Sequence, residues 1–407
     1  NLIGEHTDYN DGFVMPFALP LKTVIIGSRS TLPLSRIFSC NIDDSRQKMV
    51  SFAVNTKMTK GLPAWANYIK GTIYQYLNDL PANFSFDAVI CSNVPLGSGL
   101  SSSASLEVAT ATFLEKLCSI NNVSKVEKAL RCQQAEHTFA DTPCGIMDQF
   151  ISALGKDDSL LLIDCRSREY STCELGINLE DNKTKPIVLV TNSNIKHKLA
   201  GSEYPDRVKQ CNEAVKVLQS QYPEVKALRD ATVDMLEAVK DNLSEVCFKR
   251  ARHCIGEDKR TLATVKAISI GDYITAGKMM TQSHESLRDD YEVSCNELDI
   301  LVELALEIPG VYGSRMTGGG FGGCTVTLVH INAVTALTDH LKLKYFERTG
   351  IHCECIEAIP SAGADSVDIT DLIAKSKKSP YEAIYWAAPL TFVALAFIAY
   401  RFVVAKK

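Results

Sequence analysis

One loop limits the fold of this chain more than any other part of its sequence. Residues Val94–Ala104 (VPLGSGLSSSA) follow an apolar run that predicts a strand and lead directly into a run with helical spacing. Gly97 and Gly99 let the backbone approach an anion closely, and the helix N-terminus that follows attracts negative charge. The loop matches neither the G-x-x-x-x-G-K-[ST] nor the G-x-G-x-x-G pattern. It predicts either a phosphate-binding loop or a serine-capped helix with a purely structural role.

The rest of the chain alternates between strand-like and helix-like runs. Apolar, β-branched runs predict strands at Lys22–Gly27, Asp87–Asn93, Ser159–Asp164, Pro186–Thr191, Val311–Thr317 and Cys324–Val329. Helical spacing appears in Ser103–Leu117, Val126–Phe139, Asp241–Arg260, Gly271–Asp290 and Leu298–Leu306. No internal repeat interrupts this order. We therefore expect a mixed fold of the α/β or α+β class.

Length and charge limit the organisation and the partners of the chain. Its 407 residues suggest two or three folded units. A polar stretch at Leu175–Lys185 predicts a joint between a unit 1–178 and a unit 179–361, with a linker and tail at 362–407. The 43 basic and 48 acidic residues give a net charge of −5. This balance provides no overall positive field, so we expect no nucleic-acid partner.

The cysteines and the C-terminal tail bear on localisation. The 14 cysteines are scattered without C-x-x-C pairs. This predicts reduced, mostly buried thiols in a cytoplasmic protein.

Residues Ala383–Tyr400 form an uncharged run flanked by lysines, arginine and aromatic residues. Such a run predicts either a tail anchor that contacts the membrane or a hydrophobic tail helix that packs on the body of the protein.

A polar run near the start of the chain suggests a ligand with hydroxyl groups. Residues Gly4–Gly12 (GEHTDYNDG) lie between two apolar stretches. Their carboxylates and imidazole suit a sugar, whose hydroxyls both donate and accept hydrogen bonds. A turn stabilised by Asp8 and Asn10 side chains fits the same pattern.

Two acids and a glycine cluster are further candidates for a site. Asp148 stands in an apolar run, where a carboxylate needs a partner or a chemical role, so it is a candidate base, a helix N-cap or a buried hydrogen-bonded acid. Glu136 lies on a predicted helix and is either a Mg²⁺ ligand or a solvated side chain. Met316–Gly323 joins two predicted strands with five glycines, which indicates a close approach of the backbone to a ligand or a neighbouring strand.

Taken together, these segments resemble the galactokinase family of the GHMP small-molecule kinase superfamily. The motifs NLIGEHTDYNDGFVMPFAL, VPLGSGLSSSAS and SRMTGGGFGGCTV stand in the family's order, and the resemblance runs from Asn1 to about Ile359. It implies an α+β fold with two lobes. The N-terminal lobe would be a ribosomal S5-like α/β domain and the C-terminal lobe a ferredoxin-like one, with the active site in the cleft between them.

The resemblance also implies roles for individual residues. Asp148 takes the place of the catalytic aspartate, which accepts the proton of the sugar's anomeric hydroxyl as that oxygen attacks the γ-phosphate of MgATP. The positions that match sugar contacts are Glu5, His6, Asp8, Gly145 and Tyr204. Those that match the nucleotide and its phosphates are Gly97, Gly99, Ser101, Ser102, Ser103 and Trp65, and Ser103 and Glu136 match the Mg²⁺ positions. The implied reaction is ATP-dependent phosphorylation of galactose to galactose 1-phosphate, the entry step of galactose catabolism.

Two alternative functions and one departure from the pattern qualify this interpretation. An N-acetylgalactosamine kinase shares the fold, but Thr7–Asn10 favours plain galactose. The second alternative is a non-catalytic sensor of galactose and ATP, like a fungal paralogue whose loop is disrupted in its serine-alanine part. In this chain Ser101–Ala104 is whole, which disfavours a sensor. The family has Gly-Arg-Val before the residues that match Asn1–Ile3, and its arginine lies beside the catalytic aspartate. We expect strongly weakened activity in a molecule that begins at Asn1, full activity in a longer one, and a monomer in either case.

Overall fold

Three β-sheets organise the computed structural model, which describes residues 1–176, 186–196 and 200–367. The first sheet has the order β2 (Thr23–Arg29), β5 (Phe86–Ser92), β3 (Ser35–Ser39) and β4 (Met49–Phe52). A small sheet contains β1 (Phe13–Val14), β6 (Ser159–Asp164) and β7 (Tyr170–Glu174). The third has the order β11 (Glu354–Ala358), β8 (Pro186–Lys196), β10 (Gly322–His330) and β9 (Val311–Thr317). Within these sheets the strands pair antiparallel, except that β3 runs parallel to β5.

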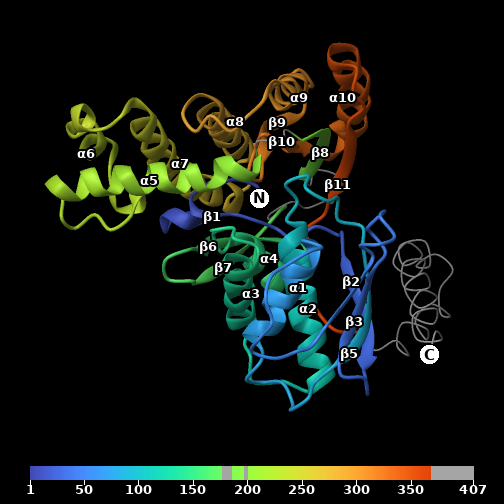
Figure 1. Ribbon diagram of the computed structural model, residues 1–407. Helices are drawn as coiled ribbons and strands as arrows, with labels where there is room; N and C mark the ends of the chain where they lie inside the picture. The colour runs from blue at the N-terminus through green and yellow to red at the C-terminus, as the bar shows by residue number, and fades with distance from the viewer. Residues whose placement is uncertain (177–185, 197–199, 368–407) are drawn as a thin grey trace.

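The helices form two groups, one in each lobe (Figure 1). Beside the first sheet lie α1 (Trp65–Gln75), α2 (Ser102–Cys118), α3 (Lys125–Phe139) and α4 (Met147–Leu154). The second lobe contains α5 (Ala200–Gln221), α6 (Val233–Ala238), α7 (Glu245–Ser269), α8 (Tyr273–Asp289), α9 (Asn296–Leu306) and α10 (Val334–Thr349). Short 3₁₀ turns occur at η1 (Asp8–Asn10), η3 (Leu228–Asp230), η4 (Lys240–Asn242) and η5 (Ile331–Ala333). This arrangement agrees with the predicted two-lobed α+β fold.

The third sheet is buried on both faces, and its alternating side chains show what covers each face. Val188 and Val190 of β8 belong to a core that also contains residues of β6, β7 and α8. Leu189, between them, belongs to a core formed with α9 and α10. Successive side chains of a strand point to opposite faces, so β8 is anchored from both sides. The small sheet therefore packs between the two lobes and places the N-terminal segment at their junction (Figure 1).

The predicted elements are largely confirmed. Two predicted strands, at Ser159–Asp164 and Val311–Thr317, have the observed bounds of β6 and β9, and the other four correspond to β2, β5, β8 and β10. The five predicted helical runs correspond to α2, α3, α7, α8 and α9. The predicted start of α7 was too early, because the Ser244 side chain caps the helix by accepting a hydrogen bond from the Cys247 N–H.

Two predictions fall partly or wholly on residues that the structure does not describe. The run Ala383–Tyr400 lies outside the described residues, and so does most of the predicted joint at Leu175–Lys185 with the boundary at 178. Within the described ranges, no helix is both long enough and apolar enough to cross a membrane.

All 14 cysteines are free thiols. Most of them are buried, and only Cys40 is classed as exposed. This confirms the prediction of unpaired, mostly buried thiols.

Candidate active site

The glycine-serine loop leads into α2 through an unusual serine. Ser101 has a left-handed backbone (φ 57°) and its side chain makes no capping hydrogen bond to the helix. Its hydroxyl instead donates a hydrogen bond to the Asp148 carboxylate. The structural interpretation of Ser101 as a helix cap is therefore wrong. The free N–H groups at the start of α2 remain available to an anion.

The second glycine cluster is explained by close contact with this loop. It forms the β9–β10 connection, and a Cβ atom added at Gly318 (φ 82°) would lie 2.8 Å from the Gly99 carbonyl oxygen. A Cβ at Gly323 would lie 2.6 Å from the Ser98 carbonyl oxygen. Side chains at these positions would push the C-terminal lobe away from the loop. The close backbone approach predicted for the cluster is therefore present, and at Gly318 and Gly323 it is made to the glycine-serine loop.

Asp148 lies in the first turn of α4, one residue after the start of the helix. The N-cap residue is Ile146, so the interpretation of Asp148 as a helix N-cap is wrong. Burial raises the pKa of Asp148, the Ser101 hydrogen bond partly offsets this, and the negative charge of Glu5 raises it further. Asp148 therefore contacts the glycine-serine loop at Ser101 and lies within electrostatic range of Glu5 in the polar run Gly4–Gly12.

Glu136 is a buried acid near the phosphate loop, and not the solvated side chain that one interpretation predicted. It is 6% exposed. Its Oε2 atom lies 2.8 Å from Gln149 Nε2, and the Ser103 hydroxyl also donates to the carboxylate. Burial and the charge of Asp148 raise the pKa of Glu136 to about 7, against the lowering effect of these hydrogen bonds.

The oxygen atoms at this position suit a magnesium ion. Ser103 and Glu136 already contact each other, and Asp148 is close enough to influence the titration of Glu136. Among residues 1–176, 186–196 and 200–367, no group of three or more acidic, cysteine or histidine residues could hold a metal ion alone. Mg²⁺ in phosphoryl-transfer sites usually takes one or two carboxylates and completes its shell with water and phosphate oxygens. The donor set therefore fits Mg²⁺ bound together with a nucleotide.

Glu5 is held by the C-terminal lobe. It is 2% exposed, and its Oε1 atom accepts hydrogen bonds from Thr317 Oγ1 at 2.7 Å and from the Gly318 N–H at 2.9 Å. Arg315 Nη2 lies 3.2 Å from the same oxygen. Burial raises the pKa of Glu5, but Arg315 and these hydrogen bonds outweigh it, so the pKa lies below its ordinary value.

Asp8 and Gly145 meet at the start of α4. The Asp8 carboxylate accepts hydrogen bonds from the backbone N–H groups of Met147 and Tyr9. A Cβ added at Gly145 would lie 1.8 Å from Asp8 Oδ2, so only glycine fits beside this carboxylate. Burial, with the charges of Asp148 and Glu5, raises the pKa of Asp8 to about 7.

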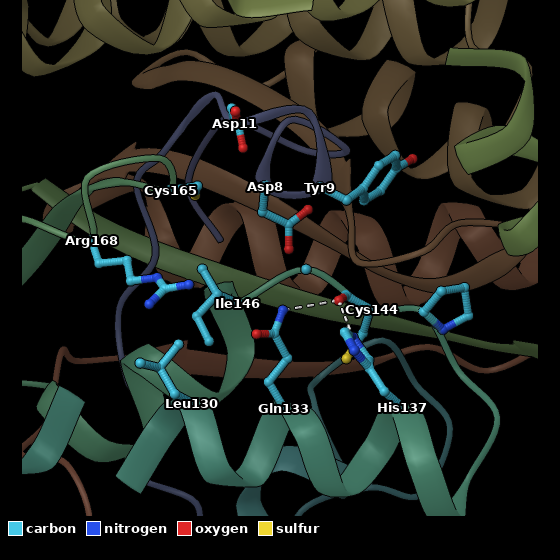
Figure 2. A pocket seen from close by; sticks show the side chains of 12 residues that line it. Asp8, Tyr9, Asp11, Leu130, Gln133, His137, Cys144, Ile146, Cys165 and Arg168 are labelled. Atoms are coloured by element: carbon cyan, nitrogen blue, oxygen red, sulfur yellow. Dashed lines mark hydrogen bonds between the residues drawn. The ribbon is translucent and has the colours of Figure 1, made fainter. Parts of the chain in front are cut away.

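A cavity of about 280 Å³ lies beside Asp8 and Gly145 (Figure 2). On its lower side in the figure, Gln133 Nε2 and His137 Nε2 lie 3.1 and 2.8 Å from the Cys144 carbonyl oxygen. These contacts fix the backbone just before Gly145 against α3. The position of Gly145 is thus determined from two sides, by Asp8 and by α3.

His6 and Tyr204 complete the group of predicted sugar contacts. His6 is 5% exposed and has a left-handed backbone (φ 65°). Its ring centroid lies 5.9 Å from that of Tyr204. The Tyr204 hydroxyl accepts a hydrogen bond from the Gly145 N–H, and Asp8 and Asp148 both influence its titration. The structure therefore brings His6 and Tyr204 to the same place as Asp8 and Gly145.

Trp65 lies apart from these contacts. It begins α1, and its indole N–H donates to the Gln47 carbonyl oxygen at 3.0 Å. Its ring packs against the core of the N-terminal lobe. Its proximity to a nucleotide remains a prediction.

Several residues that hold the site were not identified from the sequence. Arg315 is completely buried, and His253 Nε2 lies 3.1 Å from the Glu5 carbonyl oxygen. A signal for Arg315 existed, because it is a cation in a predicted strand directly before the glycine cluster. His253 lies in a long, mostly polar helix, where nothing in the sequence distinguishes it from its neighbours. Gln149 lies next to Asp148. Its amide is uncharged, so unlike a carboxylate it does not stand out in an apolar run.

Comparisons with known proteins agree with this geometry. The sequence matches the models for the GHMP kinases N terminal domain at residues 67–156, the galactokinase galactose-binding signature at residues 1–29 and the GHMP kinases C terminal domain at residues 264–343. Among solved structures, Lactococcus lactis galactokinase complexed with galactose has a TM-score of 0.84 and 32% identity, with 90% of this chain and 92% of that chain covered. A mevalonate kinase, with a TM-score of 0.58 and 19% identity, shares the fold and covers 88% of this chain and 96% of its own.

Curated relatives carry the assignment further. Galactokinase from Homo sapiens is 50% identical over 349 residues, which is 85% of this chain and 85% of the relative. Galactokinase from Chloroflexus aurantiacus is 43% identical over 368 residues, 90% of this chain and 91% of the relative. Identity at this level over nearly the whole length, together with the galactose-binding signature, shows that the chain belongs to the galactokinase family of GHMP kinases.

Proposed function

We propose that this chain transfers the γ-phosphoryl group of ATP to the anomeric hydroxyl of galactose, which yields galactose 1-phosphate and ADP. The observation that carries the proposal is the position of Asp148. It accepts a hydrogen bond from Ser101 of the phosphate loop and lies within electrostatic range of Glu5 and Asp8 of the signature segment. One acid thus lies between a helix N-terminus suited to phosphate and a polar group suited to a sugar.

The sugar is bound by side chains of both lobes. Glu5, Asp8 and Tyr204 offer oxygen atoms to its hydroxyls, and His6 offers a ring nitrogen. Gly145 contributes by leaving room for Asp8, because any side chain there would displace the carboxylate. Because Arg315 and Thr317 already fix Glu5, little side-chain entropy is lost when the sugar binds.

The triphosphate lies on the other side of Asp148. Gly97 and Gly99 allow the loop backbone to follow the phosphates, and the N–H groups at the start of α2 and the hydroxyls of Ser101, Ser102 and Ser103 hydrogen-bond to them. Ser103 and Glu136 would hold the Mg²⁺ ion, which would supply positive charge to neutralise the phosphates. The nucleotide base extends toward the segment that contains Trp65.

Asp148 acts on the nucleophile. Burial and, to a lesser extent, the negative charge of Glu5 keep its pKa above the ordinary value, which improves its ability to accept the proton of the anomeric hydroxyl. Ser101 fixes the carboxylate at the end of the phosphate loop, so that the hydroxyl oxygen is directed at the γ-phosphate. The other contacts position the reactants, as is usual in phosphoryl transfer.

Replacement of the central acid tests the proposal. We expect Asp148→Asn to lower galactose-dependent ADP release by about 10²–10⁴-fold while ATP binding persists. Asp141→Asn is the matched control, since that acid is exposed and pairs with Lys60, and it should retain full turnover. Undiminished ADP release by Asp148→Asn would contradict the role of this acid. Absence of ADP release from the unaltered chain would favour a sensor, and faster turnover of N-acetylgalactosamine than of galactose would favour that sugar.

The reaction belongs to a monomer in the cytoplasm. Every residue proposed for the site comes from one chain, so no second copy is required. The 14 free cysteines suit a reducing compartment. We propose a boundary between the two lobes at residue 178. Sedimentation of the purified protein tests whether it is a monomer.

A further inference from the structure

A closed ring of hydrogen-bonding contacts surrounds His6. His6 Nδ1 lies 2.8 Å from the Tyr9 hydroxyl, which lies 2.7 Å from the Tyr291 hydroxyl. Tyr291 Oη lies 3.2 Å from Cys211 Sγ, and Cys211 Sγ lies 3.9 Å from Cys254 Sγ. The Cys254 thiol then donates to the carbonyl oxygen of His6 at 3.7 Å. The ring begins and ends on the same residue.

One contact in the ring has a fixed direction. The His6 carbonyl can only accept, so the Cys254 thiol must donate its single hydrogen to it. The amide of Asn10 already directs its hydrogens to the same carbonyl, at 2.9 Å, and to Cys254 Sγ, at 3.5 Å. Asn10 is not one of the groups that the five ring contacts join, so the hydrogen of each contact comes from one of its own two partners.

The number of hydrogens determines the remaining directions. The ring has five contacts, and each of them needs one hydrogen. Tyr9, Tyr291 and the two cysteines carry one hydrogen each, which makes four. The fifth must come from His6 Nδ1. With Cys254 committed to the carbonyl, Cys211 donates to Cys254, Tyr291 to Cys211, Tyr9 to Tyr291 and His6 Nδ1 to Tyr9.

We propose that this ring holds His6 in the Nδ1–H tautomer, so that its bare Nε2 atom accepts a hydrogen bond from a hydroxyl of the bound sugar. The identity of the ligand rests on the function proposed above, whereas the tautomer does not. In a neutral imidazole one nitrogen donates and the other accepts, so the partner of Nδ1 decides the role of Nε2. Tyr9, Tyr291, Cys211 and Cys254 are then positioning residues that act through His6.

The surroundings of the ring support this assignment. His6 Nε2 is buried and has no hydrogen-bond partner among the residues that the structure describes. A buried N–H without a partner is rarer than a buried acceptor without one, which favours a bare Nε2. Burial lowers the pKa of His6 to about 3, so the ring is neutral at pH 7 and exists as one of its two tautomers.

The ring couples the sugar site to the C-terminal lobe. Tyr291 is completely buried beyond the end of α8, Cys211 lies on α5 and Cys254 on α7. The ring centroids of Tyr291 and His6 are 4.7 Å apart, so Tyr291 also limits the tilt of the imidazole. Three segments of the second lobe therefore determine which nitrogen of His6 carries the hydrogen and how the imidazole ring is oriented.

Nitrogen NMR of the histidine rings tests the tautomer directly. The full chain is labelled with ¹⁵N-histidine, and the His6→Asn variant identifies the His6 signals among the 8 histidines. We expect a protonated Nδ1 and an unprotonated Nε2 at pH 7 without any ligand. A protonated Nε2 in the unaltered chain would overturn the proposal.

Removal of a single hydroxyl should reverse the tautomer. In Tyr291→Phe, Tyr9 has no acceptor in the ring other than His6 Nδ1, so we expect it to donate there and Nε2 to become protonated. Tyr345→Phe is the control, because it removes another buried tyrosine hydroxyl, one that donates to the Ser193 carbonyl oxygen at 2.9 Å, far from the ring. An unchanged His6 pattern in Tyr291→Phe would overturn the proposal.

A cysteine pair provides a milder test in case Tyr291→Phe does not fold. Cys211→Ala opens the ring, whereas Cys211→Ser keeps a donor and an acceptor at the same position. We expect the alanine variant to lose the Nδ1–H preference and the serine variant to retain it. The same pattern in both variants would show that the ring does not determine the tautomer.

Galactose then separates the two proposals. We expect galactose to shift the Nε2 signal of the unaltered chain, and Tyr291→Phe to raise the KM for galactose about tenfold with a smaller change in kcat. An Nδ1–H tautomer that does not respond to galactose, in a chain that releases no ADP, would refute the proposed function and the sugar contact but leave the ring intact. Normal turnover in a chain whose His6 Nε2 is protonated would support the proposed function but refute the tautomer.

Discussion

Two groups of buried acids in this molecule differ in whether the fold supplies them with a cation. Glu5 lies beside Arg315, and Glu257 pairs with Arg260 at 2.7 Å. Burial raises the pKa of Glu257, but Arg260 and its other neighbours bring it down to about 2. The second group, Asp8, Asp148 and Glu136, receives hydrogen bonds but no guanidinium from the part of the chain that the structure describes, and the pKa of each is raised. The difference separates acids whose charge the fold itself balances from acids whose charge is left for a ligand to balance.

The second group is costly for the free protein. The charge of Asp148 repels those of Asp8 and Glu136, and burial disfavours the charged forms of all three acids. A fold that only had to be stable would replace them with neutral residues. Their retention is understandable if a metal ion, a triphosphate and a sugar provide the missing partners, because active sites commonly sacrifice stability for function.

The largest expected effect comes from removing the cation of the first group. Arg315→Met leaves Glu5 buried beside no positive side chain, and we expect it to lower the free energy of unfolding by about 3–5 kcal/mol. Urea denaturation measures this loss. The double variant Glu5→Gln, Arg315→Met removes both charges and should recover part of it. If the single and the double variant lose the same free energy of unfolding, the ion pair with Glu5 is not what makes Arg315 important.

In the second group, the same kind of change should reduce activity rather than stability. Glu136→Gln keeps the shape of the side chain but removes a proposed metal ligand, so we expect kcat to fall on the order of 100-fold. The concentration of Mg²⁺ needed for half-maximal rate should rise. The free energy of unfolding should be unchanged or higher, because a buried and repelled charge is gone. A clear loss of stability would mean that Glu136 belongs with the structural acids.

The pH dependence of stability distinguishes the two groups by its sign. The pKa of Asp8 is raised to about 7, so the folded chain binds this proton more tightly than the unfolded chain does. The stabilisation is complete below about pH 4 and is lost as the pH rises through 7. We expect Asp8→Asn to stabilise the protein at pH 8 relative to pH 5 by at least ~1.4 kcal/mol, the value of one pKa unit. Thermal unfolding at both pH values measures it, and equal effects at the two would contradict the raised pKa.

The sequence predicted the parts of the molecule whose signal is local. Strand β6 contains an unbroken apolar run, and the glycine-serine loop is a short pattern with a physical reason for each residue. The helix α10 carried such a signal as well, since its buried residues Val334, Leu337 and Leu341 have helical spacing, but they were not used. Strand β4, with four residues and one fully buried side chain, is too short to be distinguished from a loop.

The sequence predicted a site residue only where that residue is unusual in its own local segment. An acid in an apolar run or five glycines between strands need an explanation, so Asp148 and Gly318 were found from the sequence. Tyr291 and Cys211 are ordinary core residues in their own segments. Their importance comes from being within hydrogen-bonding distance of one another, over separations of 80 residues between these two and 282 between Tyr9 and Tyr291. No spacing rule for helices or strands reaches that far.

The smallest expected effect comes from an arginine that resembles Arg315 in chemistry but not in burial. Arg166 binds Asp230 through two nitrogens, at 2.7 and 2.8 Å, and lowers the pKa of that acid to about 2, so its contribution is lost as the pH falls from about 4 through 2. The Arg166 side chain is 36% exposed, however, and Asp230 is 22% exposed. Water solvates both groups when the pair is broken, so we expect Arg166→Gln to cost less than ~1 kcal/mol at pH 7, and less still at pH 2, where about half of the folded molecules have a protonated Asp230. Urea denaturation of Arg166→Gln and Arg315→Met side by side isolates burial as the variable. Equal losses would mean that the number of hydrogen bonds, and not exclusion of water, sets the value of an arginine in this fold.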